Sequence, residues 1–297
     1  MEKIIKKRDK IHKKLKKCQR KIHDLEYELI ELERDATEID EKEIIKQMNL
    51  NEQQNKIVDA KQEKENILVL ACPGSGKTHT LISRYINLVT NHSSGVNIDP
   101  EKILLITFTK KAGQEMENRL KGLIPTKLPH YVGSLHGLGY RLLQRFNKIN
   151  YTVLDEKDSK LLLRDVIDST ISIDSIEDDD ISIIKSKASM IIDQASTSYP
   201  INLTNVLAKL NLENYLSVFK NILKNYQETK KKQNLVDFND LMVLLANFLK
   251  TKKADEFLNS IEYIFFDEYQ DVNPIQNFIL SMFKEKTNIM VVGDDAQ

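Results

Sequence analysis

The sequence has no tryptophan and only two cysteines, Cys18 and Cys72, among its 297 residues. Two cysteines are too few for a disulfide framework or a zinc site, which fits a reducing, intracellular setting. No apolar run approaches the length of a membrane span, and the charged N-terminus lacks the apolar region of a signal peptide. We therefore expect a cytoplasmic protein with no membrane partner.

The chain also lacks any excess of charge of one sign, because 44 Lys and Arg residues balance 44 Asp and Glu residues. Nucleic-acid binding cannot be argued from this total, and any basic patch must be local. The hydrophobic fraction of 41% is enough for real cores. The length allows roughly two domains of ordinary size.

Residues 1–46 contain neither glycine nor proline and show a seven-residue apolar period. The period is carried by Ile11, Cys18, Leu25, Leu32 and Ile39, with Leu15, Ile22, Leu29 and Ala36 between them. This spacing is typical of a coiled-coil helix, which we predict for residues 1–47.

Charge is divided along this predicted helix. Residues 1–21 hold eleven basic and two acidic side chains, whereas residues 24–43 hold ten acidic and two basic ones. An antiparallel pair would match basic to acidic segments, so we expect antiparallel self-association or docking on a coiled-coil protein partner. The alternative is a single solvated helix folded on the body of the protein.

A glycine-rich loop stands between a predicted strand, 67–70, and a predicted helix. Strand, loop and helix together form the context of a phosphate-binding P-loop, in which backbone N–H groups surround a phosphate. Lys77 is placed to reach the β- and γ-phosphates, and the Thr78 hydroxyl to hold Mg²⁺. The predicted nucleotide-binding residues here are Cys72, Pro73, Gly74, Ser75, Gly76, Lys77, Thr78 and His79. Ala71 stands where the strict pattern has glycine, and the alternative is a turn that binds no ligand.

A second apolar strand, 103–108, follows about thirty residues later, the spacing of a βαβ unit with a parallel sheet. Thr107, Phe108 and Lys110 lie where this strand ends, at the edge where open α/β sheets bind ligands. Hydroxyls, an aromatic ring and lysine suit a strand of nucleic acid. The alternative is an ordinary strand end that caps a helix. A third short strand begins at Tyr131 and leads into a small-residue turn that holds His136.

From about residue 150 to 258 the pattern becomes helical, with an acidic loop expected at 173–181. A lysine run, 230–232, is read as solvated, with contact to a phosphate backbone as the alternative. Strand character returns at 263–266 and leads directly into Asp267 and Glu268. In a P-loop protein, such a pair holds Mg²⁺ and activates the attacking water.

Taken together, the motifs resemble superfamily 1 helicases of the UvrD/Rep/PcrA type. The matching segments, in chain order, are LNEQQ (50–54), ACPGSGKT (71–78), ITFTKKA (106–112), GSLHGL (133–138), LVDFNDL (235–241), DEYQD with VNPIQ (267–276) and VVGDDAQ (291–297). Four positions depart from the family pattern: His79 for Arg, Lys110 for Asn, Leu135 for Phe and Tyr269 for Phe.

The resemblance implies an α/β fold: a RecA-like P-loop NTPase domain at 48–138 and 259–297, interrupted by a helical insertion domain at 139–258. It implies ATP and Mg²⁺ as cofactors and 3′→5′ movement along single-stranded DNA. Residue by residue, it places Gln54 on adenine, Lys77 and Thr78 on phosphate and Mg²⁺, and Asp267 on the metal. Glu268 would be the catalytic base and Gln297 a γ-phosphate sensor. Thr107, Phe108, Lys110 and His136 would line the DNA path.

The family's second RecA-like domain, with its arginine finger, is expected after residue 297. Residues 1–297 are therefore expected to act as an N-terminal fragment that binds ATP but hydrolyses it slowly. The alternative function is a nucleotide-dependent interaction or remodelling module that acts on a protein partner through the N-terminal coiled-coil arm.

Overall fold

A computed structural model describes residues 48–60, 66–90, 97–147, 151–173, 178–283 and 287–294, with the isolated positions 21, 25 and 44. The predicted coiled-coil arm and its pairing lie almost wholly outside these residues. The chain divides into two compact units, Met1–Lys61 with Ile82–Asn97, and Gln62–Leu81 with Ile98–Gln297. Among the described helices, none has the length and apolarity needed to span a bilayer.

The described part of the first unit contains α2 (Glu52–Val58) and the later turns of α3 (Lys77–Thr90). Asn51 caps α2: its side chain accepts the Gln54 N–H, and the Gln54 side chain accepts the Asn51 N–H in return. At the other end of α2, the buried Arg84 guanidinium donates to the carbonyl oxygens of Ile57 and Ala60, at 2.6 and 3.1 Å. This arginine therefore adds hydrogen bonds to carbonyls at and just beyond the end of α2, where donors within the helix run out.

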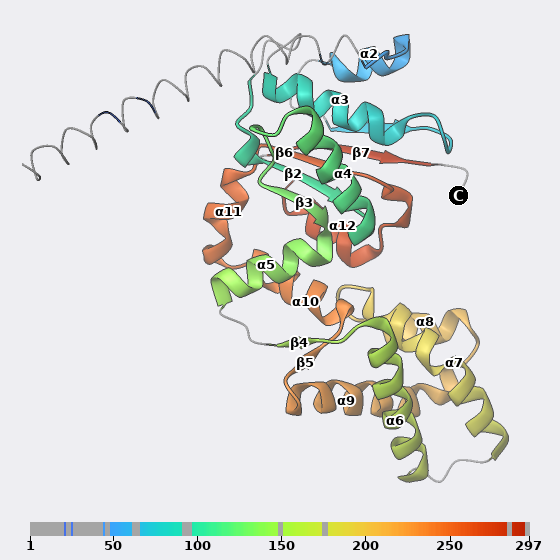
Figure 1. The fold of residues 1–297 in the computed structure, drawn as a ribbon. Helices are drawn as coiled ribbons and strands as arrows, with labels where there is room; N and C mark the ends of the chain where they lie inside the picture. Colours follow the sequence, from blue (N-terminus) through green and yellow to red (C-terminus); the bar gives the residue numbers. More distant parts are fainter. Residues whose placement is uncertain are drawn as a thin grey trace, which may run out of the picture. The chain divides into compact units, whose positions relative to one another are not determined.

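The second unit is built on a parallel five-stranded sheet (Figure 1). Its strands are β1 (Ile67–Leu70), β2 (Ile103–Thr107), β3 (Tyr131–Ser134), β6 (Tyr263–Phe266) and β7 (Asn288–Gly293). The spatial order is β1-β7-β6-β2-β3, with all neighbours parallel. Every residue of β2 and β6 is buried, as expected for strands covered on both faces. The parallel arrangement predicted from the apolar runs is confirmed.

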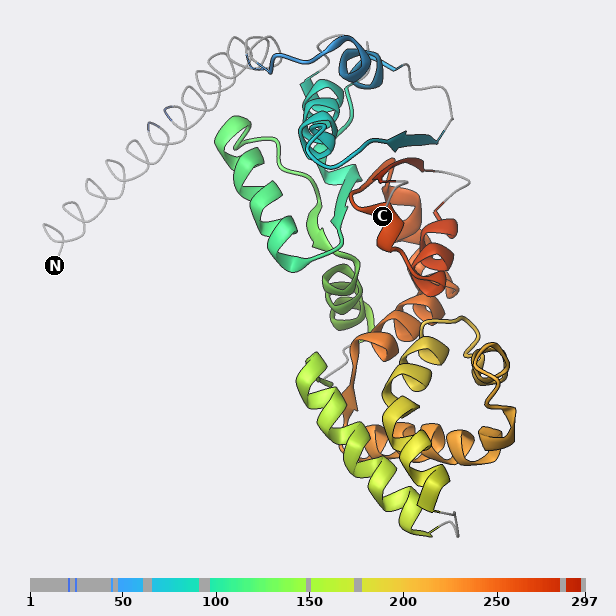
Figure 2. The ribbon, with the colours of Figure 1, turned by 90° about the vertical axis from the view of Figure 1, so that its right-hand side faces the viewer.

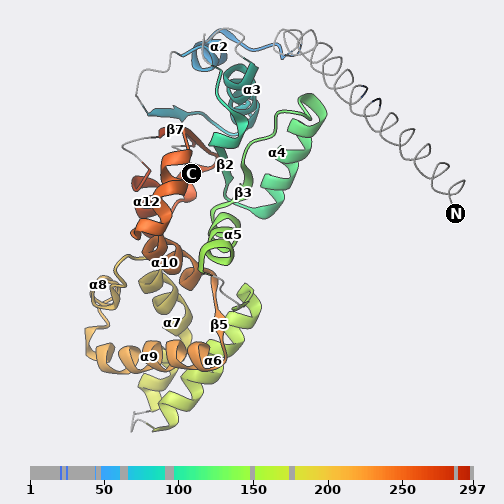
Figure 3. The same cartoon turned by 90° about the vertical axis from the view of Figure 1, so that its left-hand side faces the viewer.

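Helices α4 (Lys110–Leu123) and α12 (Pro274–Ser281) lie on opposite faces of this sheet (Figures 2 and 3). α4 lies very close to β3: a Cβ added at Gly113 would stand only 2.7 Å from the Gly133 Cα, so this approach requires glycine. α5 (Leu135–Asn147) and α10 (Phe238–Leu249) pack together and share one hydrophobic cluster with β2, β6 and α12. This cluster is the core that positions the strand ends.

Between α5 and α10 the chain leaves the sheet and builds a group of helices with its own hydrophobic cluster. These helices are α6 (Glu156–Ile173), α7 (Asp178–Ser196), α8 (Leu203–Lys209) and α9 (Leu216–Lys232). Two short parallel strands, β4 (Thr152–Val153) and β5 (Leu235–Val236), pair where the chain enters and leaves this group (Figure 1). The chain returns to the sheet through α10 and α11 (Asp255–Ser260).

Two local expectations from the sequence are wrong. The acidic stretch expected as a loop at 173–181 is helical at its described ends, because α6 continues to Ile173 and α7 begins at Asp178, while 174–177 lie outside the described residues. His136 lies in the first turn of α5, not in a turn between elements.

The lysine run 230–232 is predicted from the sequence to be solvated, but Lys230 is buried, with 4% of its surface exposed. Its Nζ lies 2.5 Å from Asp237 Oδ2 and 2.6 Å from Asp240 Oδ2, and 4.1 Å from the centre of the Tyr226 ring. The Tyr226 hydroxyl also donates to Asp237. Because Asp237 and Asp240 form the capping box of α10, this network joins the last turn of α9 to the start of α10.

We expect Lys230→Met to lower the free energy of unfolding by about 3–5 kcal/mol, because the buried Asp237 and the half-buried Asp240 lose their counter-ion. Lys231→Met, at the exposed neighbour in the same run, should change it by less than about 0.5 kcal/mol. Denaturant unfolding of both variants at pH 7 measures the difference.

The deficit of Lys230→Met should shrink as the pH is lowered, because protonation removes the uncompensated charge. Burial already raises the pKa of Asp240 above its usual range, so its protonation relieves the variant before ordinary surface carboxylates titrate. Equal stability of the two lysine variants at neutral pH would show that the buried network contributes nothing.

Candidate functional site

The loop between β1 and α3 has the backbone geometry of an anion-binding loop. Gly74 and Gly76 adopt φ values of +76° and +85°, which favour glycine. The Ser75 N–H donates to the Cys72 carbonyl at 3.2 Å, which closes a turn, and α3 begins at Lys77. Ala71 continues the ladder by donating its N–H to Gly293 O of β7 and does not adopt a positive φ. Glycine is therefore not required at this position.

The start of α3 and the end of β6 meet through one hydrogen bond. The Thr78 hydroxyl donates to Asp267 Oδ2 at 3.0 Å, across 189 residues of sequence. Thr78 stands in the first turn of α3, and Asp267 follows the last residue of β6. The two residues predicted to hold Mg²⁺ are thus in direct contact.

Asp267 is a buried carboxylate, 4% exposed. Burial raises its pKa above the usual range, while the hydrogen bond from Thr78 acts in the opposite direction and the nearby Glu268 charge adds to the rise. Its other oxygen, Oδ1, accepts the Glu268 N–H at 3.1 Å. A carboxylate that is costly to ionise in this setting would gain from a bound cation.

Glu268 has a backbone that few side chains adopt. Its φ of +55° and ψ of +51° place it in the left-handed helical region, where the other described non-glycine residues are all asparagines: Asn49, Asn211 and Asn234. This conformation costs a residue with a Cβ about 1–2 kcal/mol. It turns the Glu268 carboxylate toward the P-loop, where its Oε2 lies 3.6 Å from the largely buried Lys77 Nζ.

Gln270 holds the Glu268 carboxylate in place. Its Nε2 donates to Glu268 Oε2 at 2.7 Å, and its Oε1 accepts the backbone N–H of Asp294 at 3.0 Å. Gly293, at the end of β7, leaves room for this amide, because an added Cβ would stand 3.1 Å from the Gln270 Oε1. The side chains that follow β1 and β6 therefore converge with the backbone that follows β7.

The other predicted nucleotide residues fall into three groups. Cys72 and Pro73 are exposed in the loop, and His79 stands in the first turn of α3. Gln54 belongs to the first unit, where its side chain completes the cap of α2. Gln297 lies outside the described residues.

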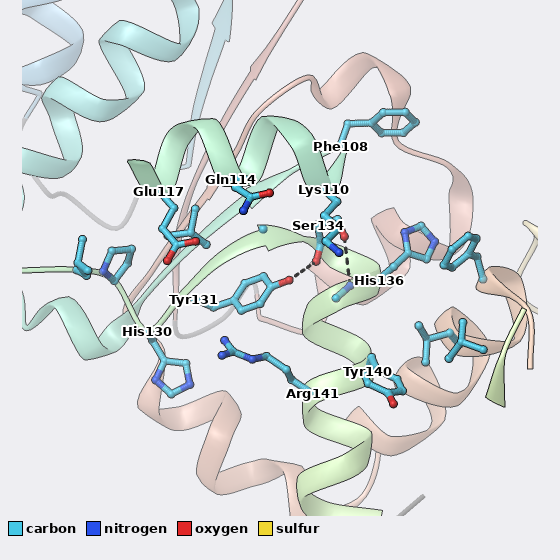
Figure 4. A pocket seen from close by; sticks show the side chains of 18 of the residues that line it. Phe108, Lys110, Gln114, Glu117, His130, Tyr131, Ser134, His136, Tyr140 and Arg141 are labelled. Carbon is cyan, nitrogen blue, oxygen red and sulfur yellow. Dashed lines mark hydrogen bonds between the residues drawn. The ribbon is translucent and has the colours of Figure 1, made fainter. Parts of the chain in front are cut away.

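A second candidate region is a cavity of about 1140 Å³ beside the end of β3, shown in Figure 4. Three of the four predicted DNA-binding residues, Phe108, Lys110 and His136, line it together. Phe108 is 45% exposed, and the His136 ring lies edge-on to Phe238 with their centres 5.3 Å apart. Burial lowers the pKa of His136, which keeps its ring neutral at physiological pH.

Thr107 is the exception among these four residues. It is 1% exposed, does not line the cavity, and donates its hydroxyl to the Thr109 carbonyl at 2.9 Å. Thr109 in turn caps α4 by accepting the Ala112 N–H. Thr107 therefore shapes the turn that presents Phe108 and Lys110.

Sequence reasoning did not single out three of the residues that complete these regions: Gln270, Phe238 and Arg141. Gln270 and Phe238 each lie within a quoted motif, but nothing in the motif says what their side chains contact. Arg141 follows the GSLHGL segment on α5, but it stands five residues after His136, a spacing that does not put two residues on one face of a helix, so the sequence does not connect it to this cavity.

A family model described as the UvrD/REP helicase N-terminal domain matches residues 50–297. The chain is 32% identical over 242 residues to the ATP-dependent DNA helicase Rep of Buchnera aphidicola subsp. Acyrthosiphon pisum, covering 77% of this chain and 35% of that protein. It is 29% identical over 259 residues to the ATP-dependent DNA helicase PcrA of Leuconostoc citreum, covering 83% of this chain and 33% of the relative.

This chain thus spans about a third of the length of these curated relatives. The resemblance drawn from the motifs is confirmed, since the family model covers the same span from residue 50 onward. The chain belongs to the family of the UvrD/REP helicase N-terminal domain.

Proposed function

We propose that this chain binds ATP and Mg²⁺ and serves an ATP-dependent DNA helicase that moves along single-stranded DNA. The observation that carries the proposal is the convergence of Lys77 and Thr78 with Asp267 and Glu268. The lysine–glutamate pair spans 3.6 Å and the threonine–aspartate pair 3.0 Å. The curated relatives, named ATP-dependent DNA helicases, support it.

The proposed roles follow from the chemistry of each group. The loop N–H groups and Lys77 bind the phosphates, and Glu268 accepts a proton from the attacking water. Gln270 fixes the direction of the Glu268 carboxylate. We also propose that Gln54 recognises adenine. In that case its Oε1 gives up the hydrogen bond from the Asn51 N–H and accepts one from the base instead.

The residues present fit a magnesium ion. Adjacent ligands of an octahedral ion with bonds of 2.0–2.1 Å lie about 2.9 Å apart, close to the 3.0 Å between Thr78 Oγ1 and Asp267 Oδ2. One neutral hydroxyl and one carboxylate also form the small protein ligand set that Mg²⁺ prefers beside phosphates. When bound, the ion neutralises charge on the phosphate oxygens.

We further propose the domain organisation that the resemblance implies: a RecA-like domain at 48–138 and 259–297, with a helical insertion at 139–258. The separate hydrophobic cluster of α6 to α9 supports an insertion. The N-terminal helix and 3′→5′ polarity rest on the sequence alone. The cavity that holds Phe108, Lys110 and His136 is the proposed path for single-stranded DNA.

We propose that residues 1–297 alone hydrolyse ATP slowly. The resemblance implies a second motor domain with an arginine finger, a group that contributes on the order of 10³ to 10⁵ in rate in other NTPases. The relatives, about three times as long, have room for such a domain.

Lys77→Ala should weaken binding of a fluorescent ATP analogue roughly 10- to 100-fold, because a charge-assisted hydrogen bond to phosphate contributes about 1.5–3 kcal/mol. Glu268→Gln, which removes only the base, should leave this binding within about threefold. Titrations with Mg²⁺ present measure both, and Lys111→Ala, at an exposed position of α4, is the control. Unchanged binding by Lys77→Ala would contradict the proposed nucleotide site.

Asp267→Asn should raise the melting temperature of the nucleotide-free protein at pH 7. Burial raises the Asp267 pKa in the folded state, so ionisation of this carboxylate at neutral pH reduces stability, and the neutral amide avoids that cost. The difference should vanish below the ordinary aspartate pKa of about 4, where both folded and unfolded chains carry a protonated carboxyl.

The same variant should lose the dependence of ATP-analogue binding on Mg²⁺. Differential scanning fluorimetry across pH measures the stability, and titration with and without Mg²⁺ measures the binding. A lower melting temperature together with intact Mg²⁺ dependence would contradict the assignment of Asp267 as a metal ligand.

A further inference from the structure

Arg141 lies on α5 and lines the same cavity as Phe108 and His136. Figure 4 shows its side chain reaching from α5 toward Tyr131 and His130, on the side of the cavity away from Phe108. Its Cζ stands over the Tyr131 ring, 5.4 Å from the ring centre. Such a cation–π contact orients the guanidinium and leaves its edge for a ligand.

Tyr131 is a fixed platform for this guanidinium. The ring is 7% exposed, and its hydroxyl donates to the Ser134 carbonyl at 2.8 Å. The hydroxyl fits against two glycines, because a Cβ at Gly133 or Gly137 would lie 2.7 or 2.4 Å from it. Burial raises the pKa of Tyr131 to about 12, so the ring is neutral and does not compete for the arginine as an anion.

Within the described part of the chain, no carboxylate pairs with Arg141. Glu117 is the single acid among the residues that line the cavity, and its Oε1 bonds to Lys121 at 2.7 Å. Lys110 adds a second cation to the lining, and no carboxylate among the described residues pairs with it. The cavity therefore offers two positive groups that the described protein does not neutralise.

The rest of the lining is suited to bases. Phe108, Tyr140 and Phe238 are 45%, 37% and 43% exposed, large values for aromatic rings beside a cavity. Exposed rings next to cations are the combination that binds a single strand through stacking and phosphate contacts. A volume of about 1140 Å³ is large enough for more than one nucleotide.

We propose that Arg141, held on Tyr131, binds a backbone phosphate of single-stranded DNA, with the neighbouring bases against the exposed rings. This inference rests on the proposed function and adds a specific phosphate contact to it. The arginine provides a planar pair of N–H donors that a phosphate accepts in bidentate fashion, which lysine at the same place does not reproduce.

The same helix provides a matched control. Arg145 lies one turn later on α5, is exposed, and stands over the Phe146 ring at 5.3 Å. It does not line the cavity. Arg141→Gln and Arg145→Gln therefore remove the same charge and the same kind of ring contact from one helix, inside and outside the proposed subsite.

The test is binding of a fluorescein-labelled oligo(dT) to the whole chain between 50 and 200 mM NaCl. Arg141→Gln should weaken binding about tenfold. It should also lower the slope of log K against log salt by about 0.7, the value for one phosphate contact on a single strand. Arg145→Gln should leave the slope unchanged, and Arg141→Lys should restore the slope but only part of the affinity.

Thermal melting and ATP-analogue binding show whether each variant is folded, and the salt slope separates a phosphate contact from a general loss of packing. If the unmodified chain binds oligo(dT) and Arg141→Gln keeps its affinity and slope, the inference is wrong while the proposed function stands. If the unmodified chain does not bind oligo(dT) at all, the DNA path of the proposed function is wrong, and this inference falls with it.

Discussion

One hydrogen bond, from the Thr78 hydroxyl to Asp267, joins the two halves of the proposed nucleotide site. It connects the first turn of α3 to the end of β6, two segments that the sheet alone does not bring into side-chain contact, because β7 stands between β1 and β6. Parallel strands make this possible, since their carboxyl ends all lie at one edge. The loop after β1, the acids after β6 and the end of β7 therefore share one small volume.

Two of the residues in this volume reduce the stability of the fold. Asp267 is a carboxylate in a buried position, and Glu268 adopts a left-handed backbone that favours glycine or asparagine. Both features oppose folding, and both place acidic oxygens next to Lys77 and Thr78. A core of fully buried strands, β2 and β6, provides the rigidity that keeps such unfavourable features in place.

Much of this arrangement could be predicted from the sequence, because each strand is a short apolar run that leads into a chemically distinctive turn. Asp267 and Glu268 come directly after β6, and Lys77 and Thr78 come after the glycine loop that ends β1, so both pairs are expected at the same edge of a parallel sheet. The burial of Lys230 could not be predicted, since a run of three lysines carries no sign that one of them faces two carboxylates from the next helix. The lining of the cavity beside β3 could be predicted only in part. Phe238 contacts His136 although it lies about a hundred residues later in the chain, and no local pattern in the sequence indicates that contact.

The Gln270 amide has a consequence for how the site can move. Its nitrogen bonds to the Glu268 carboxylate and its oxygen to the Asp294 N–H that follows β7, and a planar amide can satisfy both only in a single orientation. A shift of the chain after β7 must therefore either carry the carboxylate with it or break one of these bonds. The backbone at Asp294 and the Glu268 carboxylate are therefore linked through Gln270. A residue that does not itself face Lys77 thus helps to set the position of the carboxylate that does.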